Sequence, residues 1–123
     1  MIKKILIVDD SPIARQILKK CLPDDRDFAL FEAGDGKVGV EKYLEVNPDV
    51  TFMDLTMPVM DGVEALAKIK EINPRALVIV STADIQSKTI GEVAKLGALT
   101  VLKKPPSKET VQKALKKAEE QLQ

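Results

Sequence analysis

The chain contains no histidine, and Cys21 is its only cysteine. Enzymes that use histidine as a base, metal centres built from histidine or several cysteines, and internal disulfides are therefore excluded. Its 19 basic residues balance its 19 acidic residues, so the net charge gives no bulk attraction to nucleic acid or to an anionic membrane. No apolar run is long enough for a signal peptide or a membrane span, and we expect a cytoplasmic protein without nucleic-acid or membrane partners.

Short apolar runs are the clearest strand signals in the sequence. They are Ile5 to Val8, Val50 to Met53, Leu77 to Val80, and the weaker Val101-Leu102. Runs without polar alternation are typical of strands covered on both faces, as in a parallel sheet between helices. The run from Phe28 to Phe31 is less pure and predicts an edge strand. Stretches with helical spacing separate the runs, so the sequence predicts an α/β fold in which strand and helix alternate five times.

The helix boundaries carry signals of their own. Ser11 followed by Pro12 is typical of a helix start, because a proline at the first helical position loses no hydrogen bond. Asn47-Pro48 predicts a helix end, since the residue before a proline is pushed out of the helical conformation. The last segment predicts a surface helix that docks on the sheet through one apolar stripe: Val111, Ala114, Leu115, Ala118 and Leu122.

The unusual polar residues directly follow the apolar runs. They are Asp9 and Asp10 after the first run, then Asp54, then Ser81 and Thr82, and finally Lys103 and Lys104. Ligands of open α/β sheets bind outside the carboxyl ends of the strands. If the strands are parallel, we expect these side chains to meet at one end of the domain.

Three carboxylates in one place repel each other and raise one another's pKa values. A hard divalent cation relieves this repulsion, and Mg²⁺ takes one or two carboxylates with water while leaving positions for phosphate oxygens. A lysine and a hydroxyl from other strand ends complete a site suited to phosphoryl transfer, which depends mainly on positioning and charge stabilisation. A carboxylate acting as the nucleophile would form an aspartyl phosphate.

Asp9-Asp10, the run MDLTMPVMDG around Asp54, Thr82-Ala83 and Lys104-Pro105 together resemble the receiver domain of two-component response regulators. The resemblance covers essentially the whole chain and is closest to the stand-alone chemotaxis type. It implies a doubly wound, flavodoxin-like sheet of five parallel strands in the order 2-1-3-4-5, with five helices. It also implies a cis bond between Lys104 and Pro105, and a single receiver domain over residues 1–123 with no output domain.

The resemblance also implies a role for each matching residue. Asp54 is the expected acceptor of a phosphoryl group from the phosphohistidine of a partner histidine kinase. Asp10, Asp54 and the backbone carbonyl of Thr56 are expected to bind Mg²⁺, with Asp9 beside them acting through water and charge. Thr82 is expected to donate a hydrogen bond to the phosphoryl group, and Lys104 to contact one of its oxygens.

The family pattern leaves one choice open in this sequence and is departed from at two positions. The hydroxyl that meets the phosphoryl group is either Ser81 or Thr82, and we favour Thr82 because its spacing to Lys104 suits the family without a gap. Val101 stands where the family often carries an aromatic residue that rotates inward on activation, and Pro106 stands where an aromatic commonly follows. An aromatic switch at residue 101 is therefore excluded.

Each of these residues also has an ordinary structural explanation. Asp9 and Asp10 favour the start of a helix through capping and the helix dipole. Thr82 is a common local cap, and Lys103-Lys104 is typical of a solvated lysine pair. Their joint occurrence at four strand ends favours the functional interpretation, because capping alone gives no reason for it.

We expect a phosphorylation-controlled switch that signals by protein contact. Phosphorylation of Asp54 is expected to draw in Thr82 and Lys104 and to shift the adjoining loops between two surface states. The family usually signals through its fourth helix, fifth strand and fifth helix, so a downstream protein is expected to bind the Ile85 to Gln121 face. Its only catalysis is expected to be its own phosphorylation and dephosphorylation. We expect a monomer, and dimerisation on phosphorylation stays open.

Two other functions stay open from the sequence. A small-molecule phosphohydrolase shares the metal and aspartyl chemistry, but it is disfavoured because Thr56 stands where a second aspartate is needed, two residues after Asp54. A non-switching binding module of the same fold is disfavoured by the complete set of acids and lysine. Repeated turnover of a phosphate ester would identify the first, and indifference to Mg²⁺ and a phosphoryl analogue would identify the second.

Overall fold

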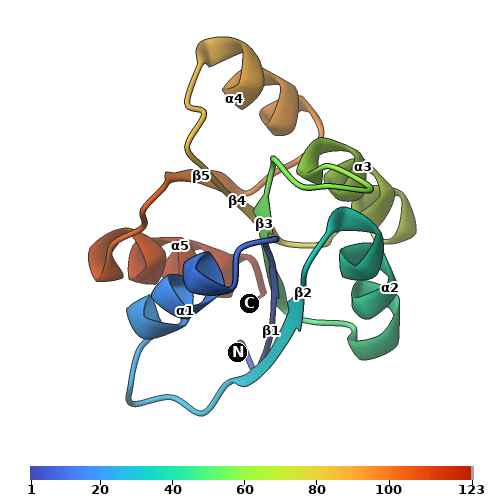
Figure 1. Cartoon of the computed structure of the whole chain (residues 1–123). Coiled ribbons are helices and arrows are strands. Elements are labelled where there is room, and N and C mark those ends of the chain that lie inside the picture. Colours follow the sequence, from blue (N-terminus) through green and yellow to red (C-terminus); the bar gives the residue numbers. More distant parts are fainter. Residues whose placement is uncertain (123) are drawn as a thin grey trace.

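A sheet of five parallel strands runs through the centre of the molecule, with helices on both faces (Figure 1). The computed structural model describes residues 1–122. The strands are β1 (Lys4–Val8), β2 (Ala29–Ala33), β3 (Val50–Asp54), β4 (Val78–Thr82) and β5 (Thr100–Lys103). The helices are α1 (Pro12–Cys21), α2 (Gly36–Val46), α3 (Gly62–Ile72), α4 (Ser87–Lys95) and α5 (Lys108–Leu122). The strand order β2-β1-β3-β4-β5 confirms the predicted doubly wound topology.

The continuous apolar runs divide their side chains between two cores. Ile5 and Ile7 of β1 face α1 and α5, whereas Leu6 and Val8 face the side covered by α2 and α3. This division follows from the strand period of two, since successive side chains point to opposite faces. Both faces of β1, β3 and β4 are buried, as the unbroken runs predict, and the exposed pattern of β2 confirms it as an edge strand.

The strands continue past their apolar runs. Asp54 is the last residue of β3, and β4 extends through Ser81 and Thr82. Leu77, the first residue of the predicted run, lies outside β4. The ladder is made by backbone groups and tolerates a polar side chain at its end, so the register pairs Asp54 with Ser81. Asp54, Ser81 and Thr82 therefore lie on strand ends, whereas Asp9, Asp10 and Lys104 directly follow β1 and β5.

The helix signals place most helix boundaries correctly. Ser11 caps α1 by accepting a hydrogen bond from the backbone N–H of Ala14 at 3.1 Å, and Pro12 is the first helical residue. Helix α2 ends before Asn47, which has a φ of 48°. The α5 stripe is buried except for Leu122, which is 41% exposed, and the bond between Lys104 and Pro105 is cis as expected. Within residues 1–122, no helix combines the length and apolar character needed to cross a bilayer.

Gly62 allows α3 to begin directly against the backbone of β3. A Cβ atom at this position would lie 1.9 Å from the carbonyl oxygen of Asp54, so any larger residue would push α3 away from it. We expect Gly62→Ala to lower the free energy of unfolding by about 2 kcal/mol or more. Gly91→Ala is the matched control, because a Cβ there meets nothing within 4 Å and should raise stability by about 0.5–1 kcal/mol. Urea denaturation of both variants measures the difference, and equal effects would contradict the close approach.

Candidate functional site

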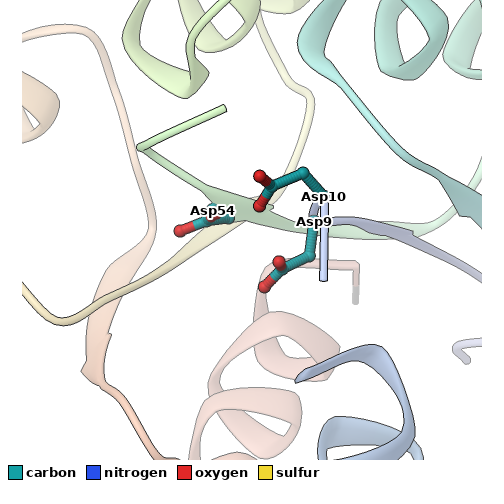
Figure 2. Close-up of side chains that lie close together, drawn as sticks. All are labelled: Asp9, Asp10 and Asp54. Atoms are coloured by element: carbon teal, nitrogen blue, oxygen red, sulfur yellow. The ribbon is translucent and has the colours of Figure 1, made fainter. Parts of the chain in front are cut away.

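Three carboxylates converge at the carboxyl end of the sheet. Asp9 and Asp10 follow β1, and Asp54 ends the neighbouring strand β3. Each contributes an oxygen atom, and these atoms all lie within 4.8 Å of one another (Figure 2). Asp9 and Asp54 are each 6% exposed, whereas Asp10 is exposed. The sequence prediction that these acids meet is confirmed in its geometry.

Lys104 supplies the positive charge that faces the acids. Its Nζ lies 2.6 Å from Oδ2 of Asp9 and 3.1 Å from Oδ1 of Asp54. Its backbone N–H donates a hydrogen bond of 2.9 Å to the carbonyl of Thr82, which fixes the loop after β5 to the end of β4. Lys103, by contrast, is exposed, so only one lysine of the pair belongs to the site.

Asp9 is held at both of its carboxylate oxygens. Oδ1 accepts a hydrogen bond of 2.9 Å from the backbone N–H of Ser11, and Oδ2 accepts one of 2.6 Å from Lys104. The N-terminus of α1, which begins at Pro12, adds a favourable partial positive charge beside the acids. Ser11, not Asp9 or Asp10, is the residue that caps this helix.

The pKa values of Asp54 and Lys104 reflect their shared environment. Burial and the negative charge of Asp9 raise the pKa of the Asp54 carboxyl, and Lys104 only partly offsets these effects. Burial alone would lower the pKa of the Lys104 ammonium, but the hydrogen bond to Asp9 and the charge of Asp54 outweigh it and raise this pKa. The site therefore favours the charged form of Lys104 and disfavours the charged form of Asp54.

The two candidate hydroxyls point to different faces of β4. Ser81 pairs with Asp54 across the ladder and lines the same cavity as Asp54 and Lys104. Thr82 is 2% exposed, and its Oγ1 accepts a hydrogen bond of 3.1 Å from the backbone N–H of Asp84. Because this oxygen already acts as an acceptor, the hydroxyl proton of Thr82 is available to another group. Thr82 therefore also makes the local turn that is its ordinary structural role.

The donor set fits a hard divalent cation. Three carboxylates within reach of one point supply the oxygen ligands that Mg²⁺ prefers. Burial, followed by the charge of Asp9, raises the pKa of Asp54. Thr56 is an exposed residue of the loop after β3, two positions beyond Asp54. Within residues 1–122, these three aspartates form the cluster of carboxylates that lie close enough together to hold a metal ion.

An apolar cavity of about 330 Å³ adjoins the site between α1 and the loop after β5. Ile13, Ile17 and the two prolines, Pro105 and Pro106, line its walls, and Phe52 lies at the sheet. Ile13 is 73% exposed although its helical spacing is typical of a core stripe. The exposed face of α1 therefore carries apolar surface up to the edge of the site.

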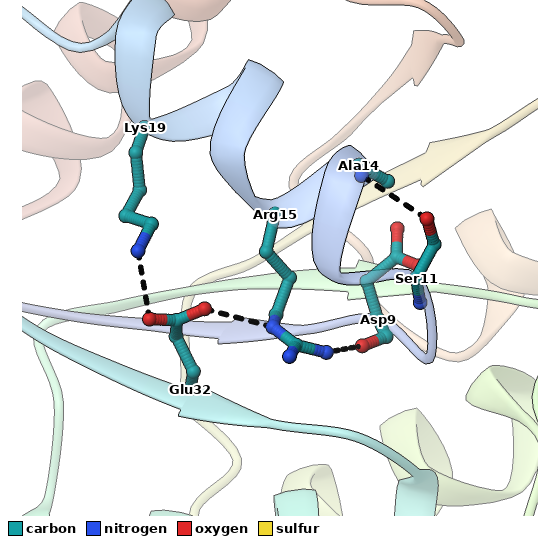
Figure 3. A network of polar contacts seen from close by, with 6 residues as sticks. All are labelled: Asp9, Ser11, Ala14, Arg15, Lys19 and Glu32. Atoms are coloured by element: carbon teal, nitrogen blue, oxygen red, sulfur yellow. Dashed lines mark hydrogen bonds and ion pairs between the residues drawn. The ribbon is translucent and has the colours of Figure 1, made fainter.

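The residues that hold the Asp9 backbone from the edge of the sheet could not be predicted from the sequence. Arg15 of α1 donates a hydrogen bond of 2.5 Å to the backbone carbonyl of Asp9, and its Nε donates one of 2.7 Å to Glu32 of β2. Lys19, one helical turn later, donates to the other oxygen of Glu32 at 2.8 Å (Figure 3). The only sequence signal is a pair of basic residues four positions apart on one helix face, which is common on surfaces.

The family model for the response regulator receiver domain matches residues 5–116 of the chain. The chain belongs to the response regulator receiver family. It is similar to the "Chemotaxis protein CheY" of Thermotoga maritima, with 39% identity over 94% of this chain and 96% of that protein. The protein of the same name in Listeria monocytogenes is 41% identical over 94% of this chain and 97% of that protein.

Solved receiver structures share the same architecture. A chain of the CheX-CheY-BeF3-Mg²⁺ complex of Borrelia burgdorferi has a TM-score of 0.86 and 30% identity, covering 92% of this chain and 86% of that chain. The response regulator domain of Thermotoga maritima CheB has a TM-score of 0.84 and 29% identity, covering 99% of this chain and 97% of that domain. As a receiver domain, the chain is a phosphorylation-controlled signalling switch.

The raised pKa of Asp54 predicts how stability responds to its removal. Folding favours the protonated carboxyl, so the contribution to stability is complete at low pH and is lost as the pH rises through the raised pKa. Without Mg²⁺, we expect Asp54→Asn to melt about 3 °C or more above the wild type at pH 7, with the difference vanishing at acidic pH. Thermal denaturation followed by circular dichroism measures this, with the exposed Asp24→Asn as the charge-matched control. The same pH dependence in both variants would contradict the prediction.

Proposed function

We propose that Asp54 is the residue at which the switch is phosphorylated, with Asp9 and Asp10 organising Mg²⁺ and Lys104 stabilising the phosphoryl group. The observation that carries this proposal is the convergence of three carboxylates and one lysine at the carboxyl end of β1, β3 and β5. The acids can hold a divalent cation, and that cation together with Lys104 would supply the positive charge that phosphoryl transfer requires.

Asp54 is the best placed of the three acids to act as the nucleophile. Both oxygens of Asp9 are engaged, by Ser11 and by Lys104. Asp10 is exposed, whereas Asp54 is buried at the end of a central strand. Lys104 contacts Oδ1 of Asp54, which leaves Oδ2 without a hydrogen-bond donor among residues 1–122. A free carboxylate oxygen in a fixed position is what nucleophilic attack on phosphorus needs.

The proposed reaction conserves atoms and charge. The Asp54 oxygen forms a bond to phosphorus while the bond from phosphorus to the donor nitrogen breaks, and the released imidazole takes a proton from solvent. Lys104 and one hydroxyl of β4 neutralise and hold the phosphoryl oxygens. Bound Mg²⁺ supplies charge stabilisation, and Asp10, Asp54 and the backbone carbonyl of Thr56 would hold it, with Asp9 acting through water.

The donor is proposed to be a partner histidine kinase. Residues 1–123 contain no histidine, so a phosphohistidine donor has to lie outside them. The similarity to proteins named for chemotaxis favours a chemotaxis-type signalling pathway. The chain's own catalysis is proposed to be limited to accepting and releasing its phosphoryl group.

The output is proposed to leave through the Ile85 to Gln121 face. Thr82 is linked to α4 through Asp84, whose N–H donates to Thr82 and whose carboxylate accepts from the backbone N–H of Gln86 and from the Thr89 hydroxyl at 2.8 Å. A shift of Thr82 toward a phosphoryl group therefore moves the start of α4. This polar link needs no aromatic residue at position 101, where Val101 packs half-buried against the α3 side.

Incubation with Mg²⁺ and a small acyl phosphate tests the acceptor. We expect intact mass spectrometry to find one labile phosphoryl adduct on the wild type and none on Asp54→Asn, because the amide cannot act as the nucleophile. Omitting Mg²⁺ should abolish the adduct. An adduct of equal yield on Asp54→Asn, or turnover of many equivalents of the phosphate ester, would contradict the proposal.

A second experiment separates the two hydroxyls of β4. We expect Thr82→Ala to slow adduct formation by about tenfold or more, because it removes a hydrogen bond to the developing charge. Ser81→Ala is the matched control and should change the rate by less than about threefold. Initial rates of adduct formation at fixed donor concentration measure both effects. The reverse order would assign the role to Ser81, which pairs directly with Asp54 in the ladder.

A further inference from the structure

Arg15 reaches from α1 across the end of β1 to the edge strand β2 (Figure 3). Its Nη1 donates to the backbone carbonyl of Asp9 at 2.5 Å, and its Nε donates to Glu32 at 2.7 Å. The Arg15 side chain is only 18% exposed, so this extended conformation is enclosed by its surroundings. One guanidinium therefore holds three elements together beside the acid cluster.

The carbonyl that Arg15 binds lies just beyond the ladder between β1 and β2. The N–H of Asp9 still donates to the carbonyl of Ala33 at 3.0 Å, as a last bond of that edge. The carbonyl of Asp9 belongs to the next peptide unit, which joins Asp9 to Asp10. Because a peptide unit is planar and rigid, holding its oxygen fixes the direction in which the chain leaves Asp9.

The two acids differ in what fixes their carboxylates. The Asp9 carboxylate is held by Ser11 and Lys104, independently of Arg15. The Asp10 side chain is exposed, and Figure 2 shows its carboxylate on the opposite side of the chain from that of Asp9. The aim of the Asp10 carboxylate therefore depends on the orientation of the peptide unit before it.

Glu32 and Lys19 complete the arrangement. Glu32 accepts from Arg15 on one oxygen and from Lys19 on the other, at 2.7 and 2.8 Å. The hydrogen bonds and charges of these two cations keep the pKa of Glu32 below its usual range, despite partial burial. Glu32 thus offsets the charge of the guanidinium, which would otherwise repel a cation bound at the neighbouring acids.

We infer that Arg15 is a positioning residue for metal binding, which orients the Asp9–Asp10 peptide unit and thereby aims the Asp10 carboxylate at the Mg²⁺ site. Because it concerns the Mg²⁺ site, this role rests on the proposed function. Partners one step removed from a metal typically change its affinity about 10- to 100-fold when they are removed.

Arg15→Ala and Lys19→Ala form a matched pair of variants. Both remove one cation from Glu32, but only Arg15 contacts the Asp9 carbonyl. By isothermal titration calorimetry with MgCl₂ alone, we expect Arg15→Ala to weaken Mg²⁺ binding about tenfold and Lys19→Ala to weaken it less than about twofold. In amide NMR spectra without metal, the Asp10 resonance should move in Arg15→Ala and stay in place in Lys19→Ala.

Further variants keep the test decisive. Arg15→Lys should recover part of the affinity, since a lysine can reach one of the two acceptors but not both, and it replaces Arg15→Ala if that variant does not fold. Equal Mg²⁺ affinities in Arg15→Ala and Lys19→Ala, or an Asp10 amide resonance that does not move in Arg15→Ala, would overturn the role of Arg15 and leave the proposed function standing. A wild type that binds no Mg²⁺ and gains no adduct would instead overturn the proposed function.

Discussion

The repulsion among three carboxylates at one end of the sheet is the constraint on which the site depends. Parallel strands end at the same edge, so acids that follow β1 and β3 have to meet there. Lys104 relieves part of the repulsion, yet burial and the charge of Asp9 keep the pKa of Asp54 raised. Binding of a cation, or neutralisation of one of the acids, lowers this repulsion and is therefore favoured at the site. The carboxylate that we propose as the phosphoryl acceptor is therefore one whose charged form the fold disfavours.

Most of the fold can be predicted from the sequence because the central strands β1, β3 and β4 each correspond to an unbroken apolar run. The central runs predict strands buried on both faces, and the acids that follow them predict the position of the site. These inferences succeed because they need only the strand period and the direction of the strands. They place Asp9, Asp10, Asp54 and Lys104 together without any knowledge of side-chain conformation.

Contacts between distant elements could not be predicted in the same way. The bond from Arg15 to the Asp9 carbonyl depends on how far α1 leans over the end of β1, and the pairing with Glu32 depends on the position of an edge strand. Basic residues on a helix face and an acid on an edge strand are ordinary surface features by composition. Strands β3 and β4 also extend beyond the ends that their apolar runs predict, because backbone hydrogen bonds continue past the apolar residues. The choice between Ser81 and Thr82 likewise depends on where a bound group sits.

The missing side chain at Gly62 brings the start of α3 into direct contact with the end of β3. The start of α3 lies against the carbonyl of Asp54, and the N–H of Gly62 donates to the carbonyl of Leu55 at 2.9 Å, so the backbone at Asp54 cannot shift toward α3 without displacing that helix. A displacement at Asp54 therefore either carries the start of α3 with it or passes to Ser81, its partner on β4. The hydrogen atom that glycine carries in place of a side chain thus couples the position of α3 to that of the Asp54 backbone.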